Sequence, residues 1–253
     1  MKLPALRNGE KGAELSRRDF MRAGAALATI TLAPGVTLTA FGGGAEAQAS
    51  PESRWGLLID VNKCKSDCDA CVTACSKENG WKDNGNPLTD AQWIRKVDLK
   101  DDDTGREFSL PVMCQHCEEP PCVDVCPTNA SFKRADGIVL VDKHICIGCR
   151  YCMMACPYKA RSFIHEEVAE EDKRSWAPRG RGTVESCTLC VHRVDRGDIP
   201  ACAVACGETG NGAILFGDLM DPESEISKRL AAYPSVALRD DLGLNPGVRY
   251  TNL

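Results

Sequence analysis

Cysteine is the residue type in this sequence whose number and spacing could carry chemistry. The chain has 16 cysteines among 253 residues, more than its Phe, Trp and Tyr residues together. The cysteines form four quartets with short internal spacings, and none is left over. The quartets are Cys64, Cys68, Cys71 and Cys75; Cys114, Cys117, Cys122 and Cys126; Cys146, Cys149, Cys152 and Cys156; and Cys187, Cys190, Cys202 and Cys206. Closely spaced thiolates bind metals, so the pattern predicts that a metal cofactor organises much of this protein.

The third quartet has the spacing of a [4Fe-4S] ligand run. Cys146 to Pro157 reads C-x2-C-x2-C-x3-C-P, the run found in bacterial ferredoxins. Three thiolates in a tight loop bind three corners of one cube, while the fourth begins a helical turn and points to a neighbouring cube. The four quartets therefore predict four [4Fe-4S] clusters, with every thiolate used as a ligand.

Short apolar segments stand in front of the cysteine loops and must position them. Residues 56–60 end four residues before Cys64, and residues 137–142 end four residues before Cys146. A third segment, 212–217, follows the last quartet. Each of these segments predicts a short strand. The repeat predicts an α+β fold of two ferredoxin-like modules of the βαβ type, each binding two clusters, with one module inserted in the other and many loops.

The predicted module boundaries follow from the positions of the quartets. The inner module is contiguous over about 105–165, and the outer module is split into about 50–78 and 180–220. A C-terminal extension covers 221–253.

Local turn and helix signals fill in the segments around the modules. Residues 93–112 predict a hairpin around the polar turn 101–105. In the extension, Asp221-Pro222 predicts the start of a short helix that ends before Pro234. The proline- and glycine-marked tail, 245–253, is expected to lie extended on a surface.

The N-terminus has the features of an export signal. Arg17 and Arg18, followed by Phe20, resemble the twin-arginine export signature. An apolar run over 23–41 follows, and small residues over 45–49 offer cleavage sites. We expect residues 1–49 to be a signal peptide and 50–253 to be a periplasmic protein. Because this route is associated with folded proteins, clusters bound before export would keep the thiolates from forming disulfides.

Charge and hydropathy exclude two classes of partner. The formal net charge of −5 and the isoelectric point near 5.5 argue against a nucleic-acid partner, which needs a basic face. No strongly apolar stretch long enough to span a membrane occurs after residue 50. We therefore expect association with a membrane only through partner subunits.

The motifs resemble the four-cluster electron-transfer subunits of membrane-bound oxidoreductase complexes. The similarity is carried by CQHCEEPPC over 114–122, CIGCRYC over 146–152, C-x2-C-x2-R-x3-G-x2-P-A-C over 187–202 and FGDLxDP over 216–222. Within this family the sequence most resembles the DsrO type, the periplasmic subunit of the sulfur-metabolism DsrMKJOP complex. The resemblance implies an integral membrane quinone-interacting subunit, a multihaem cytochrome and other subunits of the complex as partners. The iron–sulfur subunit of a polysulfide, nitrite or molybdopterin oxidoreductase is the alternative within the family.

The ferredoxin rule and the resemblance together predict which thiolates share a cube. The second and third quartets exchange their fourth cysteines, which leaves the first to exchange with the fourth. The expected ligand sets are Cys64, Cys68, Cys71 and Cys206; Cys187, Cys190, Cys202 and Cys75; Cys114, Cys117, Cys122 and Cys156; and Cys146, Cys149, Cys152 and Cys126. The first quartet departs from the family, because three residues instead of two separate Cys64 from Cys68. His116, inside the second quartet, is expected to hydrogen-bond near a sulfur.

Two uses of the cysteines outside this family remain open at the sequence level. Structural zinc favours paired C-x2-C knuckles, a pattern that only the fourth quartet approaches. Cys64, Cys68 and Cys71 also have the spacing of radical S-adenosylmethionine enzymes, which leave one iron open. Here Cys75 and the other quartets can supply every fourth ligand, and the chain is too short for a large α/β barrel beside four clusters. We therefore expect electron transfer and no catalytic residue.

Overall fold

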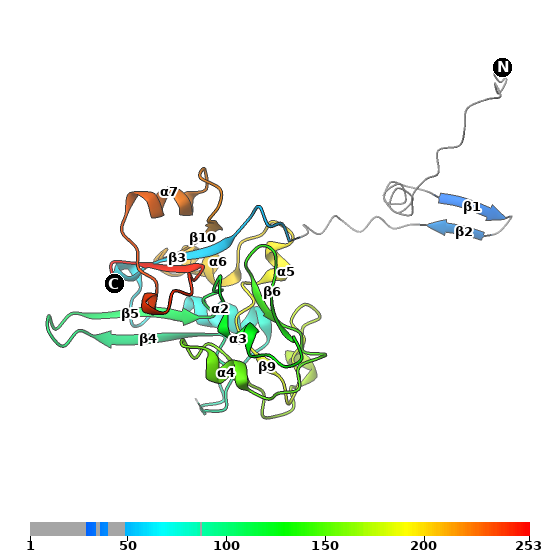
Figure 1. Cartoon of the computed structure of the whole chain (residues 1–253), viewed down its shortest axis with the longest axis horizontal. Helices are drawn as coiled ribbons and strands as arrows, with labels where there is room; N and C mark the ends of the chain where they lie inside the picture. Colours follow the sequence, from blue (N-terminus) through cyan, green and yellow to red (C-terminus); the bar gives the residue numbers. More distant parts are fainter. Residues whose placement is uncertain (1–28, 34–35, 40–48, 87) are drawn as a thin grey trace, which may run out of the picture. The chain divides into compact units, whose positions relative to one another are not determined.

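The computed structural model describes residues 29–33, 36–39, 49–86 and 88–253 (Figure 1). The chain divides into two compact units, Met1–Glu46 and Ala47–Leu253. In the first unit, β1 (Thr29–Ala33) and β2 (Val36–Thr39) pair as an antiparallel hairpin. The predicted arginine pair, Arg17 and Arg18, lies outside the described residues, as does most of the predicted cleavage region.

A three-stranded sheet is the largest sheet of the second unit. Its strand order is β10 (Ile214–Asp218), β3 (Trp55–Asp60), β11 (Val248–Thr251). β10 runs antiparallel to the central strand β3, and β11 runs parallel to it. The strands predicted over 56–60 and 212–217 are therefore confirmed, and they pair with each other. Leu57 and Ile59 on β3 are fully buried, and each such side chain contributes roughly 1.5–3 kcal/mol through burial.

The C-terminal tail forms a buried edge strand of this sheet, so the prediction that it lies on a surface is wrong. Val248 and Tyr250 on β11 are buried, and the Tyr250 hydroxyl donates to the Pro111 carbonyl at 3.0 Å. The close approach of the tail to β3 requires a glycine, because a Cβ at Gly56 would collide with the Gly247 carbonyl oxygen. The alternating apolar residues near the C-terminus pair with β3 as a strand, although the proline and glycine before them are typical of a turn.

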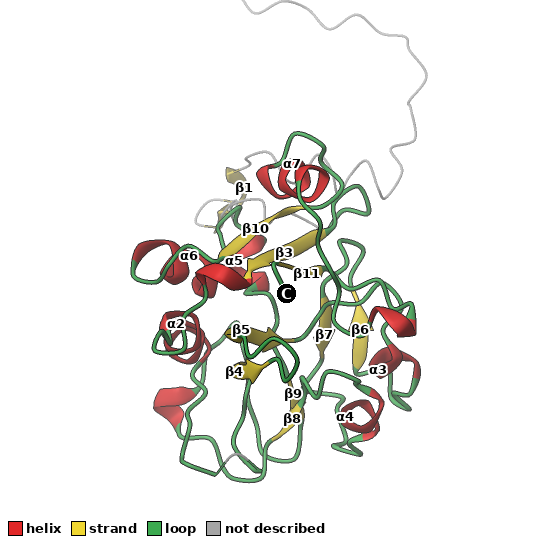
Figure 2. Ribbon diagram, turned by 90° about the vertical axis from the view of Figure 1, so that its left-hand side faces the viewer, coloured by secondary structure: helices red, strands yellow, loops and turns green. Residues whose placement is uncertain are grey.

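Helix α7 (Glu225–Ala232) lies over one face of the sheet (Figure 2). The predicted helix exists and ends before Pro234, but its predicted start is wrong. Ser224 is the N-cap, and its hydroxyl accepts from the Ser227 N–H at 3.2 Å. Asp221 instead closes a turn, because its carboxylate accepts from the Glu223 N–H at 2.9 Å.

Smaller hairpins and short helices complete the second unit and carry the cysteine loops. The predicted hairpin at 93–112 is confirmed as β4 (Ile94–Lys100) and β5 (Glu107–Met113). The predicted strand at 137–142 is confirmed as β7 (Val139–Val141), which pairs with β6 (Ser131–Lys133). The other described elements are β8 (Ser162–Phe163), β9 (Val184–Glu185), α2 (Ala70–Asn79), α3 (Pro121–Asp124), α4 (Tyr151–Ala155), α5 (Val191–Val194), α6 (Ala201–Glu208) and three 3-10 turns, Val61–Lys63, Glu170–Asp172 and Asp240–Leu242. The result is a mixed α and β fold of several small sheets, compatible with ferredoxin-like 4Fe-4S domains.

In the described part of the chain, no helix is both long and apolar enough to cross a bilayer.

Candidate metal-cluster sites

The 16 thiols are all free, and two cavities combine thiols from different quartets. One small cavity is lined by Cys64, Cys68 and Cys71 together with Cys206, which is more than 130 residues away in sequence. A second cavity is lined by Cys114, Cys117, Cys122 and Cys156. Each cavity thus holds three thiols of one quartet and the last thiol of another.

Several of the other eight thiols lie close enough to one another for their charges to interact. Burial raises the pKa of Cys187, and the nearby thiolates of Cys75 and Cys202 raise it further. Burial also raises the pKa of Cys152, which is close enough to Cys146 and Cys126 for their charges to act in the same direction.

Two pairs of helices bring distant thiols together. α2 carries Cys71 and Cys75, and α6 carries Cys202 and Cys206, so each helix holds two thiols one turn apart on one face. α2 and α6 pack against each other, with Cys71 near Cys206 and Cys75 near Cys202. The two helices therefore run in opposite directions. This arrangement places the last thiol of each quartet beside a thiol of the other.

The pair α3 and α4 repeats this arrangement in the other half of the molecule. The two helices pack together. Cys122 on α3 lies near Cys156, which follows α4 directly, and Cys126, two residues beyond α3, lies near Cys152 on α4. The two helix pairs give a physical reason why neither the first nor the second quartet lines a cavity by itself. The last thiol of each lies about one helical turn beyond the third, so it faces thiols of another quartet.

The thiol groups fit an iron–sulfur core. The cavities offer sulfur donors, and thiolates are the ligands that such clusters select. Burial, followed by the charge of neighbouring thiolates, raises the pKa of Cys71 to about 12. Burial, reinforced by the nearby Cys190, likewise raises the pKa of Cys75 to about 12. Four clustered thiolates therefore need a cation among them, and a bound metal centre deprotonates its thiols.

Backbone amides point at several of the sulfurs. The N–H groups of Ala213, Leu189 and Ser131 donate to the Sγ atoms of Cys206, Cys187 and Cys126, at 3.2, 3.4 and 3.3 Å respectively. Hydrogen bonds to sulfur are one of the means by which a protein adjusts a cluster's potential. In the third quartet's loop, Gly148 has a φ of 67° and a Cβ there would collide with the Gly182 carbonyl, so only glycine fits.

Side chains also contact the sulfurs, and no motif in the sequence pointed to them. The Trp81 Nε1–H and the Asn79 amide donate to the Cys75 Sγ at 3.4 and 3.6 Å. The Arg161 guanidinium donates to the Cys122 Sγ at 3.1 Å. Their distances from the cysteines along the chain follow no regular spacing, so only the folded structure identifies them.

Lys96 on β4 holds the unusual loop of the first quartet. Its ammonium donates to the carbonyl oxygens of Ser66 and Cys68, each at 2.6 Å, and to that of Lys65. The additional residue between Cys64 and Cys68 therefore belongs to a turn whose carbonyls converge on one cation.

The His116 imidazole is buried and makes its hydrogen bond away from the sulfurs. Its Nδ1 accepts from the Val139 N–H at 3.0 Å, which differs from the expected bond near a sulfur. Burial, assisted by the charge of Arg161, lowers the pKa of His116 to about 3. The ring is thus neutral and joins the second quartet's loop to β7.

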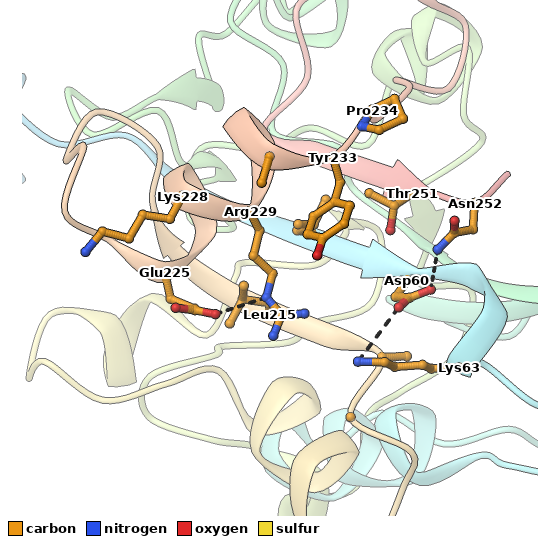
Figure 3. Close-up of a pocket in the computed structure, with 14 residues that line it drawn as sticks. Asp60, Lys63, Leu215, Glu225, Lys228, Arg229, Tyr233, Pro234, Thr251 and Asn252 are labelled. Carbon is orange, nitrogen blue, oxygen red and sulfur yellow. Dashed lines mark hydrogen bonds and ion pairs between the residues drawn. The ribbon is translucent and has the colours of Figure 1, made fainter.

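A surface groove lies beside the first thiol group (Figure 3). It has a volume of about 530 Å³ between α7 and the sheet, with Lys63, Arg229 and Tyr233 on its walls. Ala213 lines the groove, and the N–H of the same residue donates to Cys206. One backbone amide therefore separates the groove from the thiol group. Lys63 is paired with Asp60 at 3.8 Å and Arg229 with Glu225 at 3.0 Å.

Comparisons with known proteins agree with this chemistry. Residues 106–218 match the family described as 4Fe-4S dicluster domain. The sequence is 42% identical to the Hdr-like menaquinol oxidoreductase iron-sulfur subunit 1 of Archaeoglobus fulgidus, over 94% of this chain and 98% of that protein. It is 40% identical to the iron-sulfur subunit of a putative dimethyl sulfoxide reductase of Halobacterium salinarum (79% of each protein). It is 36% identical to a polysulfide reductase chain of Wolinella succinogenes (76% of this chain, 91% of that protein).

The fold and the grouped thiols define a protein of the 4Fe-4S ferredoxin type. More particularly, this protein belongs to the family of iron–sulfur electron-transfer subunits of membrane oxidoreductase complexes.

Proposed function

We propose that this protein is a non-catalytic subunit that relays electrons through four [4Fe-4S] clusters in a membrane-associated respiratory or sulfur-metabolism complex. The observation that carries the proposal is that two cavities each combine three free thiols of one quartet with the last thiol of another. Clusters with four thiolate ligands have no open iron, so they move single electrons and bind no substrate.

The proposed ligand sets are those expected from the sequence. Cys64, Cys68 and Cys71 act with Cys206, and Cys114, Cys117 and Cys122 act with Cys156; each of these sets lines one cavity. Cys187, Cys190 and Cys202 act with Cys75, and Cys146, Cys149 and Cys152 act with Cys126. The two antiparallel helix pairs support a double ferredoxin-like arrangement, in which the module at about 105–165 is inserted between the two parts of the outer module.

The proposed partners are an integral membrane quinone-interacting subunit, a multihaem cytochrome and further subunits, as in a DsrO-type complex. Support for the quinone-linked partner comes from relatives named as menaquinol oxidoreductase and menaquinone reductase iron–sulfur subunits. Relatives named as polysulfide and tetrathionate reductase subunits favour sulfur metabolism.

An exposed apolar surface marks the docking position that we propose for the membrane subunit. This surface, called here the Cys149 surface, consists of exposed apolar residues that flank the exposed Cys149 in the sequence, on its loop and on α4. Its side chains are Ile145, Ile147, Tyr151 and Met154, which are 47%, 67%, 59% and 77% exposed. Apolar residues at this exposure are typical of contacts with a permanent partner, and a cluster at that position could exchange electrons across the contact.

We further propose that residues 1–49 direct export of the folded, cluster-loaded protein to the periplasm. Replacing Arg17 and Arg18 together by Lys should leave the protein in the cytoplasm with its clusters intact. Fractionation of cells into cytoplasm and periplasm tests this outcome. Normal periplasmic delivery of the double-lysine variant would contradict the twin-arginine route.

Metal analysis of the anaerobically purified protein tests the central proposal. We expect about 16 iron and about 16 acid-labile sulfide per chain, and four one-electron signals in a redox titration followed by electron paramagnetic resonance. Zinc in place of iron would contradict the proposal. So would reductive cleavage of S-adenosylmethionine that disappears in a Cys68→Ser variant, because it would establish an open iron and an enzymatic role.

A further inference from the structure

Arg161 lies between two of the thiol groups. It is 5% exposed, and one guanidinium nitrogen donates to the Cys122 Sγ at 3.1 Å. The other terminal nitrogen donates to the Ser131 hydroxyl at 2.8 Å. The Ser131 N–H in turn donates to the Cys126 Sγ at 3.3 Å. Arg161 therefore contacts Cys122 directly. It reaches Cys126 through Ser131, and it lies close enough to Cys152, in the group that contains Cys126, for its charge to act on that thiol.

The charge of Arg161 has no carboxylate partner among the described residues. Two other largely buried arginines, Arg179 and Arg134, are paired with Glu185 at 2.9 Å and with Asp136 at 2.8 Å. In contrast, the Nε of Arg161 is buried without any hydrogen-bond partner. A buried guanidinium stays charged and is costly to hold without an anion. The anions available to it are the thiolates of the two flanking groups.

We propose that Arg161 raises the reduction potentials of the two clusters that flank it. This inference rests on the proposed function. Reduction adds one negative charge to a cluster, and a nearby fixed cation in a poorly polarisable interior stabilises the reduced form more than the oxidised form. The effect is larger for the cluster ligated by Cys122, which Arg161 contacts directly, than for the cluster ligated by Cys126.

The other two thiol groups differ in the kind of donor that faces them. At Cys75 the side-chain donors, Trp81 and Asn79, are uncharged. Near the first group, Lys96 directs its ammonium to backbone carbonyls instead of to sulfur. The direct contact between the buried Arg161 cation and a sulfur therefore distinguishes the thiol groups of the second and third quartets from those of the first and fourth.

The experiment measures midpoint potentials by a redox titration of the full-length, cluster-loaded protein, followed by electron paramagnetic resonance. Arg161→Met keeps much of the side-chain volume and removes the charge. We expect the reduction equilibrium of the Cys122-ligated cluster to fall at least tenfold, which corresponds to a potential about 59 mV lower for one electron. The Cys126-ligated cluster should show a smaller fall, and the other two clusters should keep their potentials.

Arg95→Met is the matched control. The Arg95 guanidinium donates to the carbonyls of Tyr158 and Lys159, at 2.9 and 2.7 Å, on the same segment that carries Arg161, and to no sulfur. This variant disturbs the segment without removing the cation between the clusters. We therefore expect no change in any of the four potentials.

Arg161→Lys keeps the inference testable if the methionine variant loses a cluster. Lysine keeps the charge and loses the forked contact, so we expect a smaller fall that is confined to the same two clusters. Unchanged potentials in a fully loaded variant, equal shifts in all four clusters, or the same shift in Arg95→Met would overturn the inference. Iron and sulfide contents of the unmodified protein report separately on the proposed function.

Discussion

At the scale of single residues, the chemistry depends on cations and N–H donors placed around sulfur. Lys96, Trp81, Asn79 and Arg161 all reach a cysteine loop or a sulfur from outside its quartet. Oriented donors of this kind stabilise thiolates and adjust the potentials of bound clusters. The long loop of the first quartet is the clearest case, because one ammonium holds three of its carbonyls.

Replacing Lys96 by Met should therefore loosen the loop from Cys64 to Cys68. Charge-assisted hydrogen bonds contribute about 1.5–3 kcal/mol each, so the cluster bound by this loop should lose iron to a chelator faster than the other three. Iron release, followed by absorbance under anaerobic conditions, measures the effect. Lys100→Met is the control, because Lys100 lies on the same strand and its only ion-pair partner in the described residues is the exposed Glu107. Equal release from both variants would argue against the role of Lys96.

At the scale of elements, antiparallel helix pairs decide which thiols meet. The pair formed by α2 and α6 predicts that Cys206→Ser perturbs the cluster of Cys64, Cys68 and Cys71. Cys202→Ser, one turn away on the same helix, should instead perturb the cluster that contains Cys75. Electron paramagnetic resonance of the two variants distinguishes the clusters. If both substitutions affect the same cluster, the exchanged ligand sets are wrong.

The C-terminal strand β11 gives a second prediction at this scale. Tyr250→Phe removes the hydrogen bond to the Pro111 carbonyl, which contributes about 1 kcal/mol and should lower Tm by about 2–4 °C. Tyr233→Phe serves as the control, since Tyr233 is 63% exposed and its hydroxyl points into the surface groove. Thermal unfolding of the loaded protein, followed by circular dichroism, checks both. An equal Tm for the two variants would show that this hydrogen bond on β11 contributes less to the stability of the folded protein than its burial indicates.

At the scale of the whole molecule, the two thiol groups nearest the surface face different surroundings. The thiols of Cys75, Cys187, Cys190 and Cys202, and those of Cys114, Cys117, Cys122 and Cys156, are buried. Cys68 and Cys149, which belong to the other two groups, are partly or fully exposed. The surface beside Cys68 carries the charged residues Lys65, Asp67 and Asp69, whereas the Cys149 surface exposes four large apolar side chains. We expect the permanent membrane partner at the apolar surface.

Ile147→Glu tests this assignment. A charge placed in the centre of an apolar contact remains unpaired on docking, so the variant should co-purify with its membrane partner at least tenfold less. The measurement is recovery of the partner from solubilised native membranes. Leu99→Glu, at a similarly exposed aliphatic position on β4, should leave recovery unchanged. Full recovery of the partner with Ile147→Glu would place the docking surface elsewhere.

Local features of the sequence were enough to determine the class of cofactor and several of the strands. The spacing of the quartets is a local property, and short apolar runs form strands wherever a partner strand exists. The strands at 56–60, 137–142 and 212–217 and the hairpin at 93–112 are therefore present as predicted. The cysteine motifs likewise predicted the family from the sequence.

Only the tertiary structure decided the contacts between segments far apart in the chain. β11 forms a strand because one edge of β3 is available for pairing. The sequence around residue 250 does not indicate that pairing. Arg161, Lys96 and Trp81 acquire their roles because folding brings them to sulfurs or to loops of other segments. Such contacts depend on packing and on the burial of charge, which are properties of the assembled molecule. The sequence determined which metal chemistry the protein can support, and the fold decided which charges and donors surround it.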